Sequence, residues 1–114
     1  MKFWTILDQL IATHEIIIDR PKASRHPRFP EILYPFDYGY LKGTSSGDGN
    51  EIDVCCGSLS DRRLVAVICT VDSTKKDTEA KLIVGCTNEE ITVIEQFFNR
   101  QKFGAGLVIR RGTG

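Results

Sequence analysis

The sequence predicts an α+β domain built around a small, strongly twisted and mostly antiparallel β-barrel, with an N-terminal and a C-terminal helix packed against it. Apolar residues recur at helical spacing near both ends of the chain. Six or seven short β-branched or aromatic runs lie between or beside these helical patterns, separated by turns. With 114 residues the chain has material for one modest core, so we expect a single domain spanning residues 1–114.

The composition is that of a soluble globular protein, with 41% hydrophobic and 26% charged residues. Fifteen basic and fifteen acidic residues give a formal net charge of zero, so bulk charge does not indicate a nucleic-acid or membrane partner. Asp8 interrupts the apolar N-terminal segment, which argues against a secretory signal. Four cysteines lack zinc-ligand spacing, and we expect them to be small buried hydrophobes in a reducing cytoplasm: Cys55, Cys56, Cys69 and Cys86.

Local patterns predict two helices and a series of strands. Residues 2–13 have the periodicity of an amphipathic helix. Thr87 and Glu90 form a capping-box pattern that begins a second helix, which should stop by Gly104. The β-branched or aromatic runs predict strands at 16–19, 32–34, 38–41, 52–56, 64–71, 81–86 and 107–109.

Residues 20–31 form a basic loop whose three prolines exclude both a helix interior and a central strand. The loop concentrates five basic side chains: Arg20, Lys22, Arg25, His26 and Arg28. A proline-stiffened loop loses little entropy when it binds a polyanion, so these residues favour phosphate binding. A solvated basic loop and a contact with nucleic acid are the alternatives, and phosphate needs the fewest assumptions.

The segment 34–54 reads YPFDYGYLKGTSSGDGNEIDV and joins an aromatic run to an oxygen-rich turn. The turn brings Asp48, Asn50, Glu51 and Asp53 within six residues. Carboxylate and amide oxygens are the ligands that Mg²⁺ and Mn²⁺ prefer. The alternative is a surface hairpin in which these residues only satisfy turn geometry.

Segment 34–54 resembles the soluble inorganic pyrophosphatases, a Mg²⁺-dependent family with an OB-like barrel. YPFDYGY matches the family's Tyr-Pro-x-x-Tyr-Gly-Tyr, and SGDGNEIDV matches its Asp-x-Asp-x-x-Asp turn at two of the three Asp positions, Asp48 and Asp53. The resemblance covers roughly residues 16–102. It implies hydrolysis of inorganic pyrophosphate by metal-activated water, with Mg²⁺ or alternatively Mn²⁺ as cofactor, and it implies assembly into homo-oligomers, which the family often forms.

The resemblance also implies roles for individual residues. The expected metal ligands are Asp48, Asp53, Asp72 and Glu79. Asp77 is the alternative to Asp72, because the turn between the two strands is longer here than in the family. The residues expected at the reaction are Asp48, Asn50, Asp53 and Tyr38. The expected phosphate ligands are Lys22, one of Arg25 or Arg28, Tyr34, Lys81 and Lys102.

Three departures from the family pattern leave an alternative function open. Asn50 stands where the family has an Asp that helps deprotonate or orient the attacking water, and an amide cannot act as a base. The segment from Lys22 to Tyr34 is shorter than in the family, and Gln101 replaces a Tyr. The alternative is therefore a catalytically weakened barrel that binds phosphate or a nucleotide, or that acts as an interaction protein. Another phosphoanhydride is the alternative substrate, and we expect neither nucleic acid nor a membrane as partner.

Overall fold

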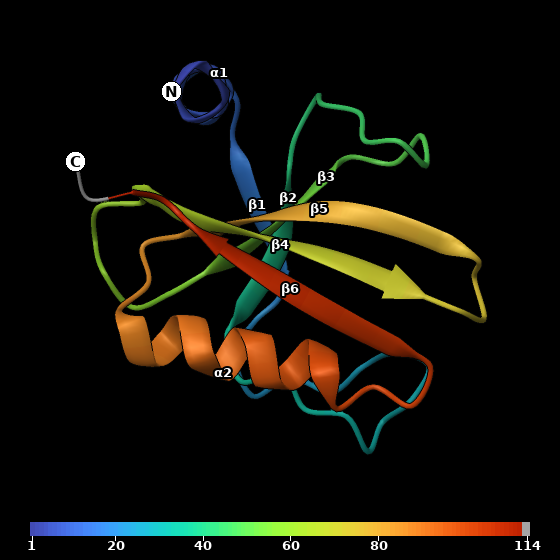
Figure 1. The fold of residues 1–114 in the computed structure, drawn as a ribbon. Helices are drawn as coiled ribbons and strands as arrows, with labels where there is room; N and C mark the ends of the chain where they lie inside the picture. Colours follow the sequence, from blue (N-terminus) through green and yellow to red (C-terminus); the bar gives the residue numbers. More distant parts are fainter. Residues whose placement is uncertain (113–114) are drawn as a thin grey trace.

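The computed structural model describes residues 1–112 and contains two helices and one six-stranded sheet (Figure 1). The helices are α1 (Lys2–Thr13) and α2 (Asn88–Asn99). The strands are β1 (Ile16–Arg20), β2 (Asp37–Leu41), β3 (Ile52–Cys56), β4 (Leu64–Asp72), β5 (Asp77–Val84) and β6 (Gly104–Arg110). The last two residues of the predicted domain 1–114 lie outside the described part.

The strand order β1-β2-β3-β5-β4-β6 confirms a mostly antiparallel sheet. Every neighbouring pair is antiparallel except β3 and β5, which run parallel. The sheet therefore consists of two antiparallel three-stranded units, β1-β2-β3 and β5-β4-β6, that join along β3 and β5. Within residues 1–112 no ladder joins β1 to β6, so the sheet stays open and the expected word barrel describes it only loosely.

Both predicted helices are confirmed, and their sequences explain their positions. Trp4 of α1 is buried in the core, and Asp8 of α1 forms an ion pair with Arg111 (2.8 Å) just beyond β6. At α2 the capping box is present: the Thr87 hydroxyl accepts from the backbone N–H of Glu90, and the Glu90 carboxylate accepts from that of Thr87. Neither helix is long and apolar enough to cross a membrane.

Three of the predicted strands differ clearly in the structure, and one of them is β6, which spans Gly104–Arg110 rather than 107–109. Strand β5 begins at Asp77 rather than at residue 81, because its polar first half is paired with β4 in a continuous ladder from Asp72 opposite Asp77. The strand predicted at 32–34 is wrong. Only Leu33 forms an isolated bridge, with Arg25, because the segment folds back on the loop before it.

The two faces of the sheet pack against different helices. Val54, Val67 and Leu82 belong to the core under α1, whereas Cys55, Ala66 and Ile83 belong to the core under α2. Side chains alternate between faces along a strand. Asp53 therefore lies on the α2 face with Cys55, and Lys81 lies on it with Ile83. This face carries the polar site.

Candidate metal and phosphate site

Lys81 is the centre of the polar site. Its ammonium donates to Asp53 Oδ2 (2.7 Å), Glu79 Oε2 (2.8 Å) and the Tyr38 hydroxyl (3.0 Å). Lys81 is only 7% exposed, and this burial opposes its charge. The surrounding Tyr38, Asp53 and Glu79 more than offset burial and raise the pKa of the ammonium. Since an ammonium has three donors, Lys81 spends all of them on residues that come from β2, β3 and β5.

Tyr38 links the Lys81 centre to a stack of aromatic rings. Its hydroxyl donates to Asp53 Oδ2 at 2.8 Å, and burial strongly raises the pKa of this phenol, so that it stays a neutral donor. The ring of Tyr34 stacks on that of Tyr38 with centroids 5.5 Å apart, and the ring of His26 stacks on Tyr34 at 6.1 Å. The Tyr34 hydroxyl in turn accepts from the guanidinium of Arg20. Tyr34 and Tyr38 are thus brought together as side chains of one site.

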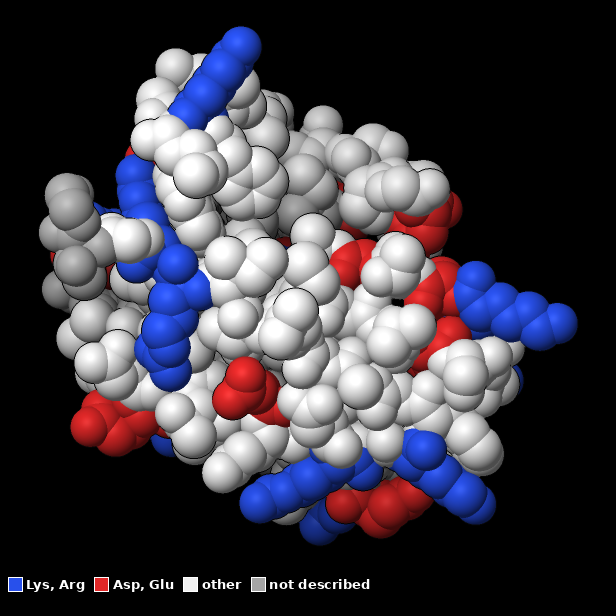
Figure 2. Space-filling model, viewed as in Figure 1, with Lys and Arg blue, Asp and Glu red and all other residues white. Residues whose placement is uncertain are grey.

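Three carboxylates meet beside the Lys81 centre. Asp48, Asp77 and Glu79 each offer one oxygen, and these oxygens lie within 4.8 Å of one another. Asp48 comes from the loop between β2 and β3, and the other two come from β5 at the tip of the β4–β5 hairpin (Figure 1). In Figure 2, viewed as in Figure 1, several red acidic side chains lie at the right of the molecule, where Figure 1 shows the tip of this hairpin, and others lie elsewhere on the surface. We call these three residues the acidic group.

The acidic group shows the electrostatic stress of close carboxylates. A hydrogen bond with Glu79, together with those from Ser46 and Asn50, holds the pKa of Asp48 well below its usual value. Burial, and then the hydrogen bond with Asp48, raises the pKa of Glu79. A proton or a cation between the oxygens would relieve the repulsion within such a group. Three carboxylate oxygens at a partly exposed position suit a hard divalent cation, so the residues fit Mg²⁺ or Mn²⁺.

The structure places Asp77, and not Asp72, in the acidic group. Oδ1 of Asp72 accepts from the backbone N–H groups of Thr74 (2.9 Å) and Lys75 (3.0 Å), so this side chain caps the hairpin turn. Both residues lie on the α2 face, since they are opposite each other in the ladder. The spacing of Asp72 and Asp77 in the sequence does not show which of the two carboxylates joins the acidic group.

Asn50 acts as a support for Asp48. Its backbone N–H donates to Asp48 Oδ1 at 3.0 Å, and its side-chain amide donates to Oδ2 at 3.3 Å. The turn is completed by Gly49, whose φ of +85° is in the left-handed region that favours glycine. The loop therefore presents Asp48 toward β5 in a fixed orientation.

The predicted phosphate ligands on the basic loop form hydrogen bonds to the loop itself or to the start of β2. The backbone N–H of Lys22 donates to Asp37 Oδ1 (2.8 Å), which anchors the loop to the start of β2. The guanidinium of Arg25 donates to the Pro30 carbonyl (2.8 Å), and the backbone of Arg28 donates to the His26 ring. The loop thus folds on itself and leaves its lysine and arginine side chains mostly exposed.

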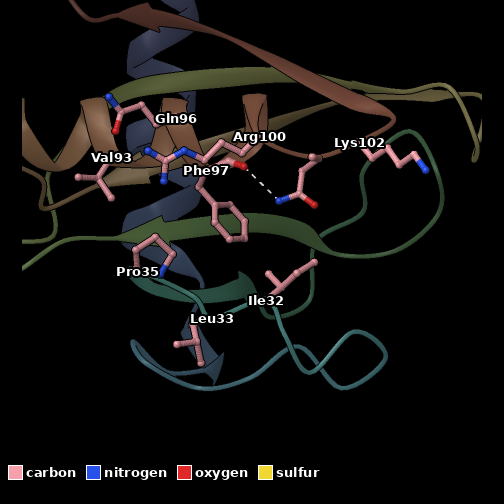
Figure 3. Close-up of a pocket in the computed structure, with 9 residues that line it drawn as sticks. Ile32, Leu33, Pro35, Val93, Gln96, Phe97, Arg100 and Lys102 are labelled. Atoms are coloured by element: carbon pink, nitrogen blue, oxygen red, sulfur yellow. Dashed lines mark hydrogen bonds between the residues drawn. The ribbon is translucent and has the colours of Figure 1, made fainter.

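Lys102 lies at the edge of a separate cavity of about 450 Å³ (Figure 3). The cavity separates the C-terminal half of α2 from the segment 32–35, and Phe97 points into it (Figure 3). The Lys102 ammonium lies 5.3 Å from the centre of the Phe103 ring. It points away from Phe97 in Figure 3. The structure thus does not join Lys102 to the Lys81 centre by a direct contact among the described residues.

A comparison with protein-family models finds one match. The family model described as inorganic pyrophosphatase matches residues 12–103. A search of the curated proteins finds no match. Among solved structures, an inorganic phosphatase from Anaplasma phagocytophilum is 17% identical with a TM-score of 0.59, over 83% of this chain and 81% of that one.

Two further solved structures show the same fold. The inorganic pyrophosphatase from Helicobacter pylori is 17% identical with a TM-score of 0.58, over 83% of this chain and 81% of that one. That from Coxiella burnetii is 14% identical with a TM-score of 0.60, over 83% and 82% of the two chains. At these identities the structural similarity shows a shared fold and no more. The match to the family model, in contrast, is a similarity of sequence over residues 12–103.

Proposed function

Since the chain belongs to the inorganic pyrophosphatase family, we propose that it hydrolyses inorganic pyrophosphate with the side chains that meet around Lys81. Pyrophosphate hydrolysis is the activity of the family. The observation that carries the assignment to this site is the convergence of Asp53, Glu79 and Lys81, with Asp48 and Asp77 beside them, from β3, β5 and the loop between β2 and β3.

The acidic group is our proposed metal site. Asp48, Asp77 and Glu79 would hold Mg²⁺ or Mn²⁺, with Asp53 beside them and Asp72 as the alternative ligand that the family resemblance implies. When bound, the ion would lower the pKa of a water ligand and neutralise charge on the substrate. Lys81 would keep Asp53 and Glu79 in place and lower the local negative charge that a pyrophosphate anion meets.

Tyrosines and basic residues would bind the substrate. The hydroxyl of Tyr34 is the proposed neutral donor to a phosphate oxygen, because it accepts from Arg20 and keeps its own hydrogen. The hydroxyl hydrogen of Tyr38 is already donated to Asp53, so Tyr38 would act at the site by holding this carboxylate. The proposed cationic ligands are Lys22, Arg25 or Arg28, and Lys102. Lys81, the other predicted phosphate ligand, donates to three protein groups and would act through its charge. The amide of Asn50 cannot accept the proton of the attacking water, so that proton must pass to a neighbouring carboxylate. Attack by the water oxygen on phosphorus then breaks the bridging P–O bond and yields two phosphates.

Phosphate release from pyrophosphate is the decisive measurement. We expect turnover with Mg²⁺ or Mn²⁺ that is absent without a metal and absent in Asp53→Asn. The hydrogen bonds of Asn50 to Asp48 favour one alternative, a weakened enzyme that still binds phosphate or a nucleotide. Calorimetric binding of pyrophosphate without turnover would support this alternative. Faster release of phosphate from a nucleoside triphosphate than from pyrophosphate would instead indicate another phosphoanhydride as substrate.

We further propose a cytoplasmic location and a homo-oligomer. The first is supported by the four unpaired thiols Cys55, Cys56, Cys69 and Cys86, of which three are buried. The second rests on the family resemblance, and light scattering of the purified chain tests it. A monomeric mass at working concentration would contradict it.

A further inference from the structure

Strand β1 contains an irregularity that decides which charge faces the site. Its ladder with β2 runs regularly through Ile18 opposite Gly39 and then skips one residue, so that Arg20 lies opposite Tyr38. A regular register would place Asp19 opposite Tyr38 instead, since successive residues alternate between faces. The bulge therefore places the positively charged Arg20 where the alternating pattern would place the negatively charged Asp19.

The surrounding backbone fixes this arrangement. At Gly39 a side chain would clash, because a Cβ there would lie 1.8 Å from the carbonyl oxygen of Ile17. The strands thus approach closely just before the bulge. Directly after it, Pro21 restricts the chain, and the backbone N–H of Ala23 donates to the Tyr34 carbonyl at 2.7 Å. Arg20 is held on both sides.

Arg20 has a neutral partner and no anionic one in the part of the chain that the structure describes. Its guanidinium donates to the Tyr34 hydroxyl and lies 5.6 Å from the centre of that ring. The ion pairs among residues 1–112 join Lys81 to two carboxylates and Arg111 to Asp8. A guanidinium carries five N–H groups, so most of those of Arg20 stay available to an external anion.

Arg20 and Lys81 approach the same aromatic pair from different strands. Arg20 contacts Tyr34, Tyr34 stacks on Tyr38, and Tyr38 contacts both Lys81 and Asp53. Lys81 has no donor left for a substrate, because its three hydrogens are engaged within the protein. A second cation with free donors is therefore required on this face if a dense anion is to bind beside the tyrosines.

We propose that Arg20 binds the phosphate group of pyrophosphate that lies away from the acidic group, and that Tyr34 orients its guanidinium. This inference rests on the proposed function of the same site. A guanidinium can bind two phosphate oxygens in parallel, which a lysine cannot reproduce. The free chain holds Arg20 ready through Tyr34, so little side-chain entropy is lost when the anion binds.

Steady-state kinetics of Arg20→Ala and Arg20→Lys tests the proposal. For Arg20→Ala we expect KM for pyrophosphate to rise by about 10- to 100-fold, the range for a lost charged hydrogen bond, with a smaller change in kcat. Arg20→Lys should recover only part of the loss, and added guanidinium should partly restore Arg20→Ala at concentrations that leave the protein folded. Arg110→Ala is the matched control and should keep the wild-type KM, because it removes a guanidinium on β6 that donates to Asn88 at the start of α2.

Two measurements separate a binding role from a structural one and from failure of the proposed function. Circular dichroism and the unfolding midpoint show whether each variant is folded, and calorimetry with methylenediphosphonate and Mg²⁺ measures binding without turnover. If the wild type binds this analogue but does not turn over pyrophosphate, the proposed function fails, and weaker binding by folded Arg20→Ala still supports the role of Arg20. Wild-type affinity and KM in folded Arg20→Ala, no guanidinium rescue, or no binding of the analogue by the wild type would each overturn the proposal.

Discussion

The ammonium of Lys81 lies 2.7 Å from Oδ2 of Asp53, and this ion pair spans the only parallel ladder among the described strands. Asp53 precedes Val54, which is opposite Leu82, the residue after Lys81. The same carboxylate oxygen accepts from Tyr38 on β2. One oxygen atom thus receives hydrogen bonds from two strands that flank its own.

Asp53→Asn should abolish phosphate release and lower the free energy of unfolding by about 3 kcal/mol. The substitution removes one of two counter-charges from a lysine side chain that is 9% exposed, and Glu79 remains as the other. Urea unfolding can be followed by the fluorescence of Trp4, the single tryptophan. Asp61→Asn, at an exposed carboxylate of the β3–β4 loop, is the control and should change neither quantity. If Asp53→Asn still releases phosphate, Asp53 is not a residue of the catalytic site.

Divalent-ion binding should distinguish Asp77 from Asp72. We expect Mg²⁺ or Mn²⁺ to raise the unfolding temperature of the wild type, because an ion that binds only the folded chain stabilises it. Asp77→Asn should weaken the ion's apparent affinity by about tenfold or more, through loss of a charged ligand. Asp72→Asn should retain most of the affinity but destabilise the turn that its carboxylate caps. The reverse order of the two affinities would assign the metal to Asp72.

Asn50→Asp should increase turnover with Mg²⁺. The new carboxylate lies beside Asp48, where it can take the proton of the attacking water. Without metal the same variant should be less stable than the wild type, because it adds a like charge to the acidic group. Asn50→Ala serves as the control, since it removes the amide without adding a base. A fall in activity in Asn50→Asp would mean that the water is activated in another way.

The stability of the chain should depend on Glu90 in mildly acidic solution. Burial acts to raise its pKa, but the hydrogen bonds from Thr87 and Ser58 more than offset burial, and the net pKa lies below the usual 4.5. A lowered folded pKa adds stability that is complete above the unfolded value of about 4.5 and is lost as the pH falls through the folded value. Glu90→Gln should flatten the pH dependence of unfolding in that window. An unchanged slope would show that Glu90 does not titrate with folding.

The other half of the capping box gives an independent check. Thr87→Ala should destabilise the chain by about 1 kcal/mol at neutral pH, the usual loss for an N-cap hydroxyl. Thr92→Ala, at a hydroxyl that bonds to a backbone carbonyl within the first turns of α2, is the matched control with a smaller expected effect. Equal losses of stability in the two variants would show that the Thr87 hydroxyl contributes no more as an N-cap than an ordinary hydroxyl within α2.

Local sequence signals predicted the helices and most strands, because their causes are local. The helical periodicity of residues 2–13 and the Thr87–Glu90 box coincide with α1 and α2. Strand β5 was predicted too short, since the stretch from Asp77 to Ala80 has no apolar run and is strand only through its pairing with β4. The strand at 32–34 failed for the opposite reason: its apolar residues have no ladder partner beyond the single bridge at Leu33.

The site was predicted less completely, because it depends on registers that no single stretch encodes. Asp48 and Glu79 were named from the sequence, and the structure brings them together. The choice between Asp72 and Asp77 follows from the hairpin turn, which engages one carboxylate and leaves the other free for the acidic group. Arg20 was counted only as part of a basic loop, since a bulge one residue before it is invisible in a pattern of alternating residues.

The parallel ladder between β3 and β5 has a consequence for how the chain responds to its substrate. Because Asp53 belongs to the first three-stranded unit and Lys81 to the second, neither unit contains the site by itself. A ligand that binds to both residues would therefore connect the two halves of the sheet. Amide hydrogens along Val54–Cys56 should then exchange with solvent more slowly in the liganded protein, while those at the outer edge of β6 keep their rates. Slower amide exchange along β3 would thus report that the site is occupied and that the two halves of the sheet are held together.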